Sequence, residues 1–407
     1  MTRFPFVRAR LLAVGAAWLV AVALVATRPA HAALCTIDQV PAATLLFPVF
    51  EVDLDAPARN TILSVTNVGS SATIAHFTLW TDWAIPVLNF DIYLAGLDTQ
   101  RIDLADVLLQ GRLPATGKAV SPHGPLSGQP VSFANCNNGT TPGQAPVYGD
   151  PAIPQSLLAG VRAAFVGDAS VIFSGKCAGS DRGNMLARGY VTVEANDQCT
   201  VLFPSDPTYF NDPGPTTRRN VLVGDVTMLR PLAQHAIAFG AVPIEAYPEG
   251  HAIPAGSRTF YGRYVNGTGA DGREPLPTVL EARNVDGGAF NEGTAFFVWR
   301  ETVAGNPAPV TCGQSPSWAP LATAPVAYFD ELEDVVDVSQ SFPIALDVQD
   351  SMNPALFGRA VLDLAHAGVT PLYGAPEAQA WAGWTMAATN RFVVTFPAAH
   401  HAASCAP

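Results

Sequence analysis

The chain has few charged residues, and few basic ones in particular. Asp, Glu, Lys and Arg make up 14% of its 407 residues, where about a quarter is usual. The 22 Lys and Arg residues are outnumbered by 34 Asp and Glu, so the formal net charge is −12. Binding to nucleic acid or to an anionic membrane requires clustered positive charge, because counterion release drives it. The composition therefore argues against both partners.

Several catalytic signatures are also absent. The sequence contains no G-x-S-x-G, H-E-x-x-H or S-x-x-K motif, so nothing signals a serine hydrolase, a zincin or a β-lactamase-like site. No two cysteines stand two to four residues apart, which disfavours a zinc site. Beyond the N-terminal segment no stretch is long and apolar enough to span a bilayer. We therefore expect no transmembrane segment in the mature chain, and a role other than catalysis.

The N-terminal residues have the pattern of a secretory signal peptide. Three arginines precede an apolar stretch from Leu11 to Thr27, and Ala30-His31-Ala32 fits the small-x-small cleavage rule. An uncleaved membrane anchor is the alternative, but the apolar stretch is just under the length of a spanning helix. We predict that residues 1–32 are removed and that the protein is secreted or periplasmic. The mature chain would carry 18 basic and 34 acidic residues, a net charge of −16.

The six cysteines all lie in the part predicted to be exported: Cys35, Cys136, Cys177, Cys199, Cys312 and Cys405. An even number of cysteines in an oxidising compartment predicts three disulfides. Six cysteines allow 15 pairings, and the sequence does not choose among them. Buried free thiols are the alternative, and they fit an exported protein less well.

Proline and glycine are abundant, whereas long helical periodicity is almost absent. With 35 Pro and 34 Gly, short alternating runs recur between turn residues, a pattern typical of antiparallel sheets. We expect an all-β fold, an antiparallel β-sandwich with one lobe or two. Short helices are predicted at Ser156–Phe165, with Ser156 as N-cap, and at Leu104–Leu108. The predicted strands are Leu45–Leu54, Thr61–Asn67, Ala72–Asp82, Asn89–Leu94, Ser170–Lys176, Ala187–Ala195, Val221–Leu229, Thr259–Val265, Thr294–Thr302, Ala360–Leu364, Trp381–Ala388 and Arg391–Phe396.

Residues 111–155 are the predicted boundary within the mature chain. They are rich in Pro, Gly, Ser, Thr and Asn and show no periodicity, which is unusual for so long a segment of a compact domain. We interpret them as a linker or a long surface loop. The predicted division is then an N-terminal β-sandwich region at 33–110 and a C-terminal β-rich region at 156–407.

The stretch FTLWTDWAIPVLNFDIYL, Phe77 to Leu94, predicts a hairpin with its loop at Trp83–Leu88. Period two then separates an apolar face from a face that carries aromatic rings, carboxylates and an amide. Pairing residues whose numbers sum to 171 places Trp80 opposite Asp91. A slip by one residue would mix the two faces.

The second face is the predicted ligand site, formed by Trp80, Asp82, Asp91 and Tyr93. Rings beside carboxylates are the residue types with which proteins stack against sugars and bind their hydroxyls. Two alternatives stay open: an ordinary solvated face, or a face covered by another loop or sheet. Asp82 and Asp91 would also serve as an acid/base pair if they faced each other across a cleft at about 5–10 Å.

Two clusters of charged residues are candidate sites. The acidic cluster consists of Asp330, Glu331, Glu333, Asp334 and Asp337. Clustered carboxylates suit Ca²⁺, and the alternative is a solvated acidic edge. The basic cluster suggests an anion site, or internal pairing with nearby acids, which we favour; it consists of Arg258, Arg263, Arg273, Arg283 and Arg300. Calcium is the one cofactor that these patterns suggest.

Three segments resemble exported bacterial proteins that have no assigned activity. They are CTIDQVPAATLLFPVFEVDL, the run Tyr261 to Glu301 that begins YGRYVNGTGADGREP, and CGQSPSWAP. The resemblance implies export and a β-rich fold, and it transfers no site residue.

These observations favour an exported structural, adhesive or ligand-binding protein, with carbohydrate or another cell-surface component as partner. The alternative is an exported glycan hydrolase that uses an aspartate acid/base pair.

Overall fold

The structure is a computed structural model that describes residues 40–56, 58–113, 153–254, 256–301, 307–318, 324–340, 342, 344–350, 357–364, 379–388 and 392–400. All of these belong to one unit, Ile37–Pro407. The predicted signal peptide and most of the predicted linker lie outside the described residues. Within the ranges given, no helix has the length and apolar character needed to cross a membrane.

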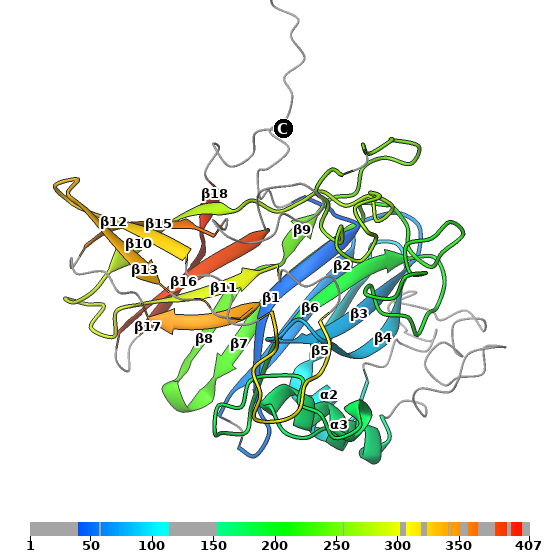
Figure 1. Ribbon diagram of the computed structural model, residues 1–407, viewed down its shortest axis with the longest axis horizontal. Helices are drawn as coiled ribbons and strands as arrows, with labels where there is room; N and C mark the ends of the chain where they lie inside the picture. Colours follow the sequence, from blue (N-terminus) through cyan, green and yellow to red (C-terminus); the bar gives the residue numbers. More distant parts are fainter. Residues whose placement is uncertain are drawn as a thin grey trace, which may run out of the picture. The chain divides into compact units, whose positions relative to one another are not determined.

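The described residues form four antiparallel sheets (Figure 1), which confirms the all-β prediction. Sheet 1 contains, in spatial order, β4 (Pro86–Leu94), β3 (Thr73–Thr81), β6 (Leu186–Asn196), β1 (Thr44–Asp53) and β9 (Val242–Ile244). Sheet 2 contains β5 (Thr99–Asp103), β2 (Asn60–Asn67), β7 (Leu222–Arg230) and β8 (His235–Gly240).

The other two sheets use the second half of the chain. Sheet 3 contains β14 (Leu346–Asp350), β11 (Thr294–Arg300), β16 (Ala380–Ala388) and β17 (Phe392–Pro397). Sheet 4 contains β13 (Val335–Gln340), β12 (Ala324–Asp330), β15 (Phe357–Asp363), β10 (Val279–Val285) and β18 (Ala399–His400). The sheets therefore divide between Ile244 and Val279 rather than at residues 111–155, because β1 and β6, on either side of that segment, pair with each other.

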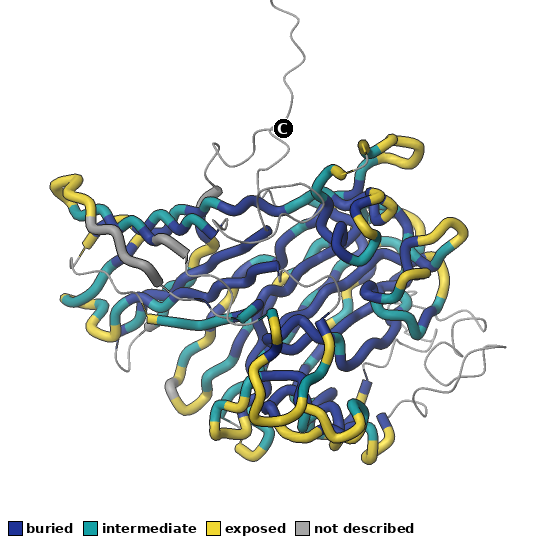
Figure 2. The backbone as a smooth tube through the Cα atoms, viewed as in Figure 1, coloured by how far each residue is buried: buried dark blue, intermediate teal, exposed yellow. Residues whose placement is uncertain are grey.

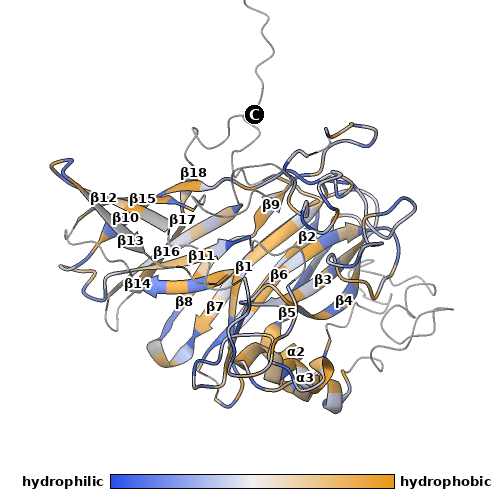
Figure 3. Cartoon of the chain, viewed as in Figure 1, coloured by the Kyte–Doolittle hydropathy of each residue, from blue (hydrophilic) through white to orange (hydrophobic). Residues whose placement is uncertain are grey.

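Sheets 1 and 2 pack face to face around a large apolar core. The side chains of Leu45 and Phe47 lie over Gly224 of β7, where a Cβ atom would come within 3.0 Å and 2.9 Å of them. Only glycine allows this close approach between the sheets. Strand β1 is largely hydrophobic in Figure 3, and six of its side chains belong to this core: Leu45, Leu46, Phe47, Val49, Phe50 and Val52.

Strand β11 is buried on both faces. Phe297 and Trp299 join the core of sheets 1 and 2, while Phe296 and Val298 join a second core with residues of sheet 4. Alternate side chains of β11 thus enter different cores, which explains its unbroken apolar run. Figure 2 shows the corresponding pattern, with buried backbone along the strands and exposed residues concentrated at turns.

Both predicted helices are present. In α2 (Leu104–Gln110), the Asp103 carboxylate caps the N-terminus and Gly111 ends the helix with φ 69°. Helix α3 (Gln155–Val166) begins one residue earlier than expected, and its N-cap is Pro154 rather than Ser156. Short 3₁₀ turns follow at η1 (Val171–Phe173) and η2 (Pro231–Ala233).

Two predicted strands are wrong. Ser170–Lys176 is a tight loop around η1, closed by a hydrogen bond from Ser170 N–H to the Lys176 carbonyl at 3.0 Å. Thr259–Val265 forms consecutive turns, because Gly262 and the left-handed Asn266 (φ 51°) fold the chain back on itself.

Candidate functional site

The β3–β4 hairpin has a shorter loop than predicted. Its turn is Asp82–Ile85, closed by a hydrogen bond from Thr81 N–H to the Ile85 carbonyl at 2.9 Å, and Pro86 begins β4. Paired residue numbers therefore sum to 167 instead of 171, so that His76, and not Trp80, lies opposite Asp91. Pro86 is tolerated because it is the first residue of an edge strand beside a register shift.

The predicted separation of the two faces is confirmed, because both sums are odd. The expectation of an exposed aromatic face is wrong. Trp80 is 1% exposed, and Asp82 and Asp91 are equally buried. Tyr93 is half-buried and packs against Ile74 and Cys199. The covered alternative describes this face, and ligand binding by these residues stays a prediction.

The hairpin's polar groups bind the backbone of residues 200–202. Asp91 Oδ2 accepts a hydrogen bond from Thr200 N–H at 3.0 Å. The Asn89 side chain donates to the carbonyls of Val201 at 2.9 Å and Leu202 at 3.3 Å. These contacts satisfy main-chain groups that burial would otherwise leave unpaired. The polar face thus anchors a covering segment of its own chain.

Asp82 and Asp91 do not form an acid/base pair. Asp91 lies opposite His76, whereas Asp82 follows the last residue of β3. His76 and Thr81 are five residues apart on β3. The backbones next to Asp91 and Asp82 are therefore about 17 Å apart along the strand. Carboxyl groups that hydrolyse glycosidic bonds stand about 5–10 Å apart. The aspartate pair that the hydrolase alternative required is therefore not assembled.

One polar row crosses four strands of sheet 1: Thr44, Glu194, His76 and Asp91. His76 Nδ1 lies 2.7 Å from Asp91 Oδ1. Burial by itself would lower the pKa of His76, but the charges of Asp91 and Glu194 raise it above its ordinary value. Burial raises the pKa of Glu194, against the opposing effects of His76 and of the hydrogen bond from Tyr261 Oη.

Arg273 covers this row from the segment 245–278. It is 1% exposed; its Nε donates to Thr44 Oγ1 at 3.1 Å, and its other nitrogens donate to the carbonyls of Asp271 and Thr217. Arg300 is likewise buried and donates to the Phe342 carbonyl at 3.1 Å. The partners named here are a hydroxyl and main-chain carbonyls, so pairing of these arginines with nearby carboxylates stays a prediction.

Trp80 lines a small internal cavity on the same face. Its ring stacks on Tyr190 at 5.7 Å, and its Nε1 donates to Thr192 Oγ1 at 3.0 Å. Arg263 and Glu301 also line the cavity. The centre of a water molecule can reach about 10 Å³ of it, which is room for about one water. The cavity has no space for a sugar.

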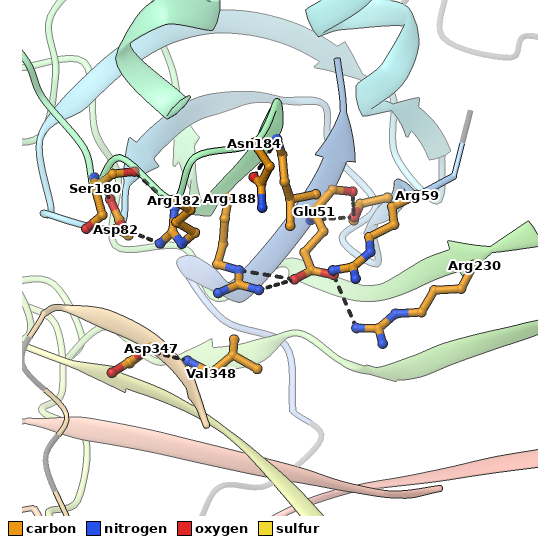
Figure 4. A network of polar contacts seen from close by, with 12 residues as sticks. Glu51, Arg59, Asp82, Ser180, Arg182, Asn184, Arg188, Arg230, Asp347 and Val348 are labelled. Carbon is orange, nitrogen blue, oxygen red and sulfur yellow. Dashed lines mark hydrogen bonds and ion pairs between the residues drawn. The ribbon is translucent and has the colours of Figure 1, made fainter. Parts of the chain in front are cut away.

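A second buried charge network lies at the other end of β1. Figure 4 shows Arg59, Arg188 and Arg230 converging on Glu51, at 3.0, 2.7 and 3.2 Å. Burial would raise the pKa of Glu51, and these three arginines lower it below its ordinary value. Asp82 belongs to the same neighbourhood, where it accepts hydrogen bonds from Arg182 and from the backbone of Ser180.

The cysteine prediction is confirmed for one pair. Cys177 and Cys312 form a disulfide across 135 residues of sequence. Cys199 is also disulfide-bonded. The remaining three lie outside the described residues: Cys35, Cys136 and Cys405.

The predicted calcium cluster forms the hairpin between β12 and β13. Asp330 Oδ1 accepts hydrogen bonds from the N–H groups of Leu332 and Asp334 at 2.8 and 2.9 Å. Glu331 and Glu333 are exposed, and Asp337 lies on β13 opposite Ala327. Among the residues that the structure describes, no three His, Cys, Asp or Glu side chains are placed to hold a metal ion. Calcium binding stays a prediction.

An open groove of about 670 Å³ lies on the outer face of sheet 4. This volume is typical of small-molecule sites. We call it the sheet-4 groove, and its lining residues are Glu281, Arg283, Phe329, Asp330, Glu331, Glu333, Phe357, Gly358, Arg359 and Val361. It brings part of the predicted acidic cluster together with Arg283 of the predicted basic cluster. Phe357 is 49% exposed beside them.

The arginines of the groove belong to neighbouring strands. Arg283 on β10 lies directly opposite Arg359 on β15, and Phe329 on β12 continues the same row. Arg359 Nη1 lies 3.0 Å from Glu281 Oε1. Arg283 is exposed, and no hydrogen bond or ion pair joins it to another described residue.

Most of the groove was not predicted from the sequence. Strand β10 was not predicted, because Glu281, Arg283 and Asn284 have weak strand propensity. The signal that could have found it is the alternation of apolar Leu280 and Ala282 with charged Glu281 and Arg283, which places the charged side chains on one face.

In comparisons with known proteins, no family model, no curated protein and no solved structure matches this chain.

Proposed function

We propose that the protein is an exported, non-enzymatic ligand-binding protein that binds carbohydrate in the sheet-4 groove. The observation that carries the proposal is the composition of this groove. An open sheet face brings two phenylalanines together with two arginines and exposed carboxylates, at Phe329, Phe357, Arg283, Arg359 and the glutamates. Export rests on the N-terminal sequence pattern, and the disulfide Cys177–Cys312 is compatible with it.

Sugars need both kinds of group that the groove contains. The C–H face of a sugar ring packs on an aromatic ring, and its hydroxyls hydrogen-bond to carboxylates and guanidinium groups. Phe357 is exposed and free to receive such a ring, while Glu331 and Glu333 are exposed acceptors. The strands hold these side chains on a rigid surface, which lowers the entropy cost of binding.

Binding fits the groove better than hydrolysis does. A glycosidase acid needs a carboxyl in apolar surroundings that raise its pKa. Glu331 and Glu333 are solvated, Glu281 is ion-paired with Arg359, and Asp330 caps its own turn. None of these carboxyls has the surroundings of a general acid.

A glycan array with matched phenylalanine variants tests this proposal. Phe357→Ala removes the exposed ring of the groove, and Phe396→Ala removes a ring of similar exposure, 41%, on β17 outside it. We expect wild type and Phe396→Ala to bind the same glycans and Phe357→Ala to lose about tenfold or more in affinity. Absence of any glycan binding by wild type would refute the proposal, as would equal binding by the two variants.

A further inference from the structure

The arrangement of Arg283 and Arg359 has no evident benefit for folding. Like charges directly opposite each other on an antiparallel pair are destabilising, and these two residues are direct partners. Glu281 forms an ion pair with Arg359, and no ion pair joins it to Arg283 among the described residues. The chain has 34 acidic and 22 basic residues, so a shortage of carboxylates does not explain why Arg283 has no acidic partner among the described residues.

Other arginines of the protein show the contrast. Arg59, Arg182 and Arg188 each contact a buried carboxylate. Arg283 instead projects from the outer face into the groove. An exposed guanidinium beside a second one is suited to a planar anion, because each presents two parallel N–H donors to a carboxylate.

We propose that Arg283 and Arg359 together bind the carboxylate of an acidic sugar, so that the groove selects glycans containing uronic acid. This inference rests on the proposed function and names its ligand class. The sugar ring then lies beside Phe357, which is two residues from Arg359 on β15. Its hydroxyls donate to Glu331 and Glu333 on the adjacent hairpin.

The groove's own acids limit how much negative charge the ligand carries. Glu281 lies on one side of the arginine row, and Glu331 and Glu333 lie on the hairpin beyond the end of β12. A ligand with an anion on every sugar would bring like charges against these glutamates. The preferred ligand therefore has single uronic acids separated by neutral sugars.

The test is an array on which each acidic glycan stands beside its carboxyl-reduced form. It includes oligosaccharides that alternate glucuronate with N-acetylglucosamine, and the full exported chain is applied at physiological salt. We expect wild type to prefer the carboxylate forms by about tenfold or more, the value of a charge-assisted hydrogen bond. Arg283→Gln and Arg359→Gln should abolish this preference, while Arg283→Lys should keep part of it.

Arg101→Gln is the matched control, because Arg101 is an exposed arginine on β5, outside the groove. It should bind as wild type does. Equal binding of carboxylate and reduced forms by wild type would overturn the arginine inference and leave the proposed carbohydrate function standing. A preference that survives in Arg283→Gln and Arg359→Gln would overturn it as well. No binding to any glycan would overturn both proposals.

Discussion

Two sheet faces of this protein have similar residues and different surroundings. The polar face of sheet 1 carries Trp80, His76 and Asp91, and segments around 200–217 and 257–273 cover it. The outer face of sheet 4 carries Phe357, Arg283 and Arg359, and they remain exposed among the described residues. Aromatic and charged residues on one face of a sheet thus mark either an internal polar layer or a surface for a ligand. What covers the face decides between these.

The sharpest contrast is between Arg273 and Arg283, ten residues apart. Arg273→Ala removes a buried guanidinium that donates to Thr44 and to two carbonyls and whose charge acts on Glu194 and Asp271. We expect it to lower the free energy of unfolding by about 3–5 kcal/mol. Arg283→Ala removes an exposed like-charge contact, so the free energy of unfolding should change by no more than about 0.5 kcal/mol. Urea unfolding of both variants measures the difference. Equal destabilisation would contradict the distinction between the two faces.

Glu51 gives the next largest effect and a dependence at low pH. Its pKa is lowered in the folded protein, so its contribution is present above its unfolded value of 4.5 and is lost as the pH falls through the folded pKa. Glu51→Gln should cost about 3 kcal/mol at neutral pH and weaken the loss of stability in acid. The measurement is the denaturant midpoint from pH 7 to pH 3. Parallel curves for wild type and variant would rule out this role.

His76 should show the opposite dependence. Its pKa is raised in the folded protein, so its contribution is full below its unfolded value of 6.5 and is lost as the pH rises through the folded pKa. His76→Gln should cost about 2 kcal/mol at pH 6, because it removes a hydrogen bond to a buried carboxylate, and less at higher pH. NMR titration of the imidazole checks the direction; a pKa below 6.5 would show that burial outweighs Asp91.

The smallest effect is expected at Glu245 and Glu274. Glu274 N–H donates to the Glu245 carbonyl at 2.8 Å, and burial together with the Glu245 charge raises the pKa of Glu274 to about 7. Stability should therefore fall as the pH rises from about 4.5 towards 7. Glu245→Gln should recover about 0.2–1 kcal/mol at pH 8. Melting curves at pH 5 and 8 test this; a gain at pH 5 alone would contradict it.

The sequence predicted local features better than distant contacts. Period two correctly assigned Phe77 and Phe90 to one face and His76 and Asp91 to the other. The register was missed because it depends on loop length, and Pro86 was expected to remain in the loop. A cover over the face was one of the alternatives left open, and the sequence did not say which segment forms it, since Thr200 and Arg273 lie more than a hundred residues away from the hairpin. Alternation reports which residues share a face, and it carries no information about what packs on that face.

For a similar reason, the sequence did not predict where the chain divides between sheets 1 and 2 and sheets 3 and 4. Residues 111–155 look like a linker because they lack periodicity, yet β1 and β6 pair across them. The segment between Ile244 and Val279, where the sheets do divide, contains Phe260, Tyr261 and Tyr264 and was interpreted in part as a strand. Its aromatic residues pack over sheet 1 as turns, so composition alone resembled a strand.

The contrast between the covered face of sheet 1 and the open face of sheet 4 is tested most directly by the rate at which phenylglyoxal modifies each arginine in the folded protein, resolved by peptide mass spectrometry. We expect rapid modification of Arg283 and Arg359, and no reaction of Arg263 and Arg273 until the protein is unfolded. Reaction of Arg273 as fast as that of Arg283 would contradict it, as would protection of Arg283 and Arg359 in the folded protein.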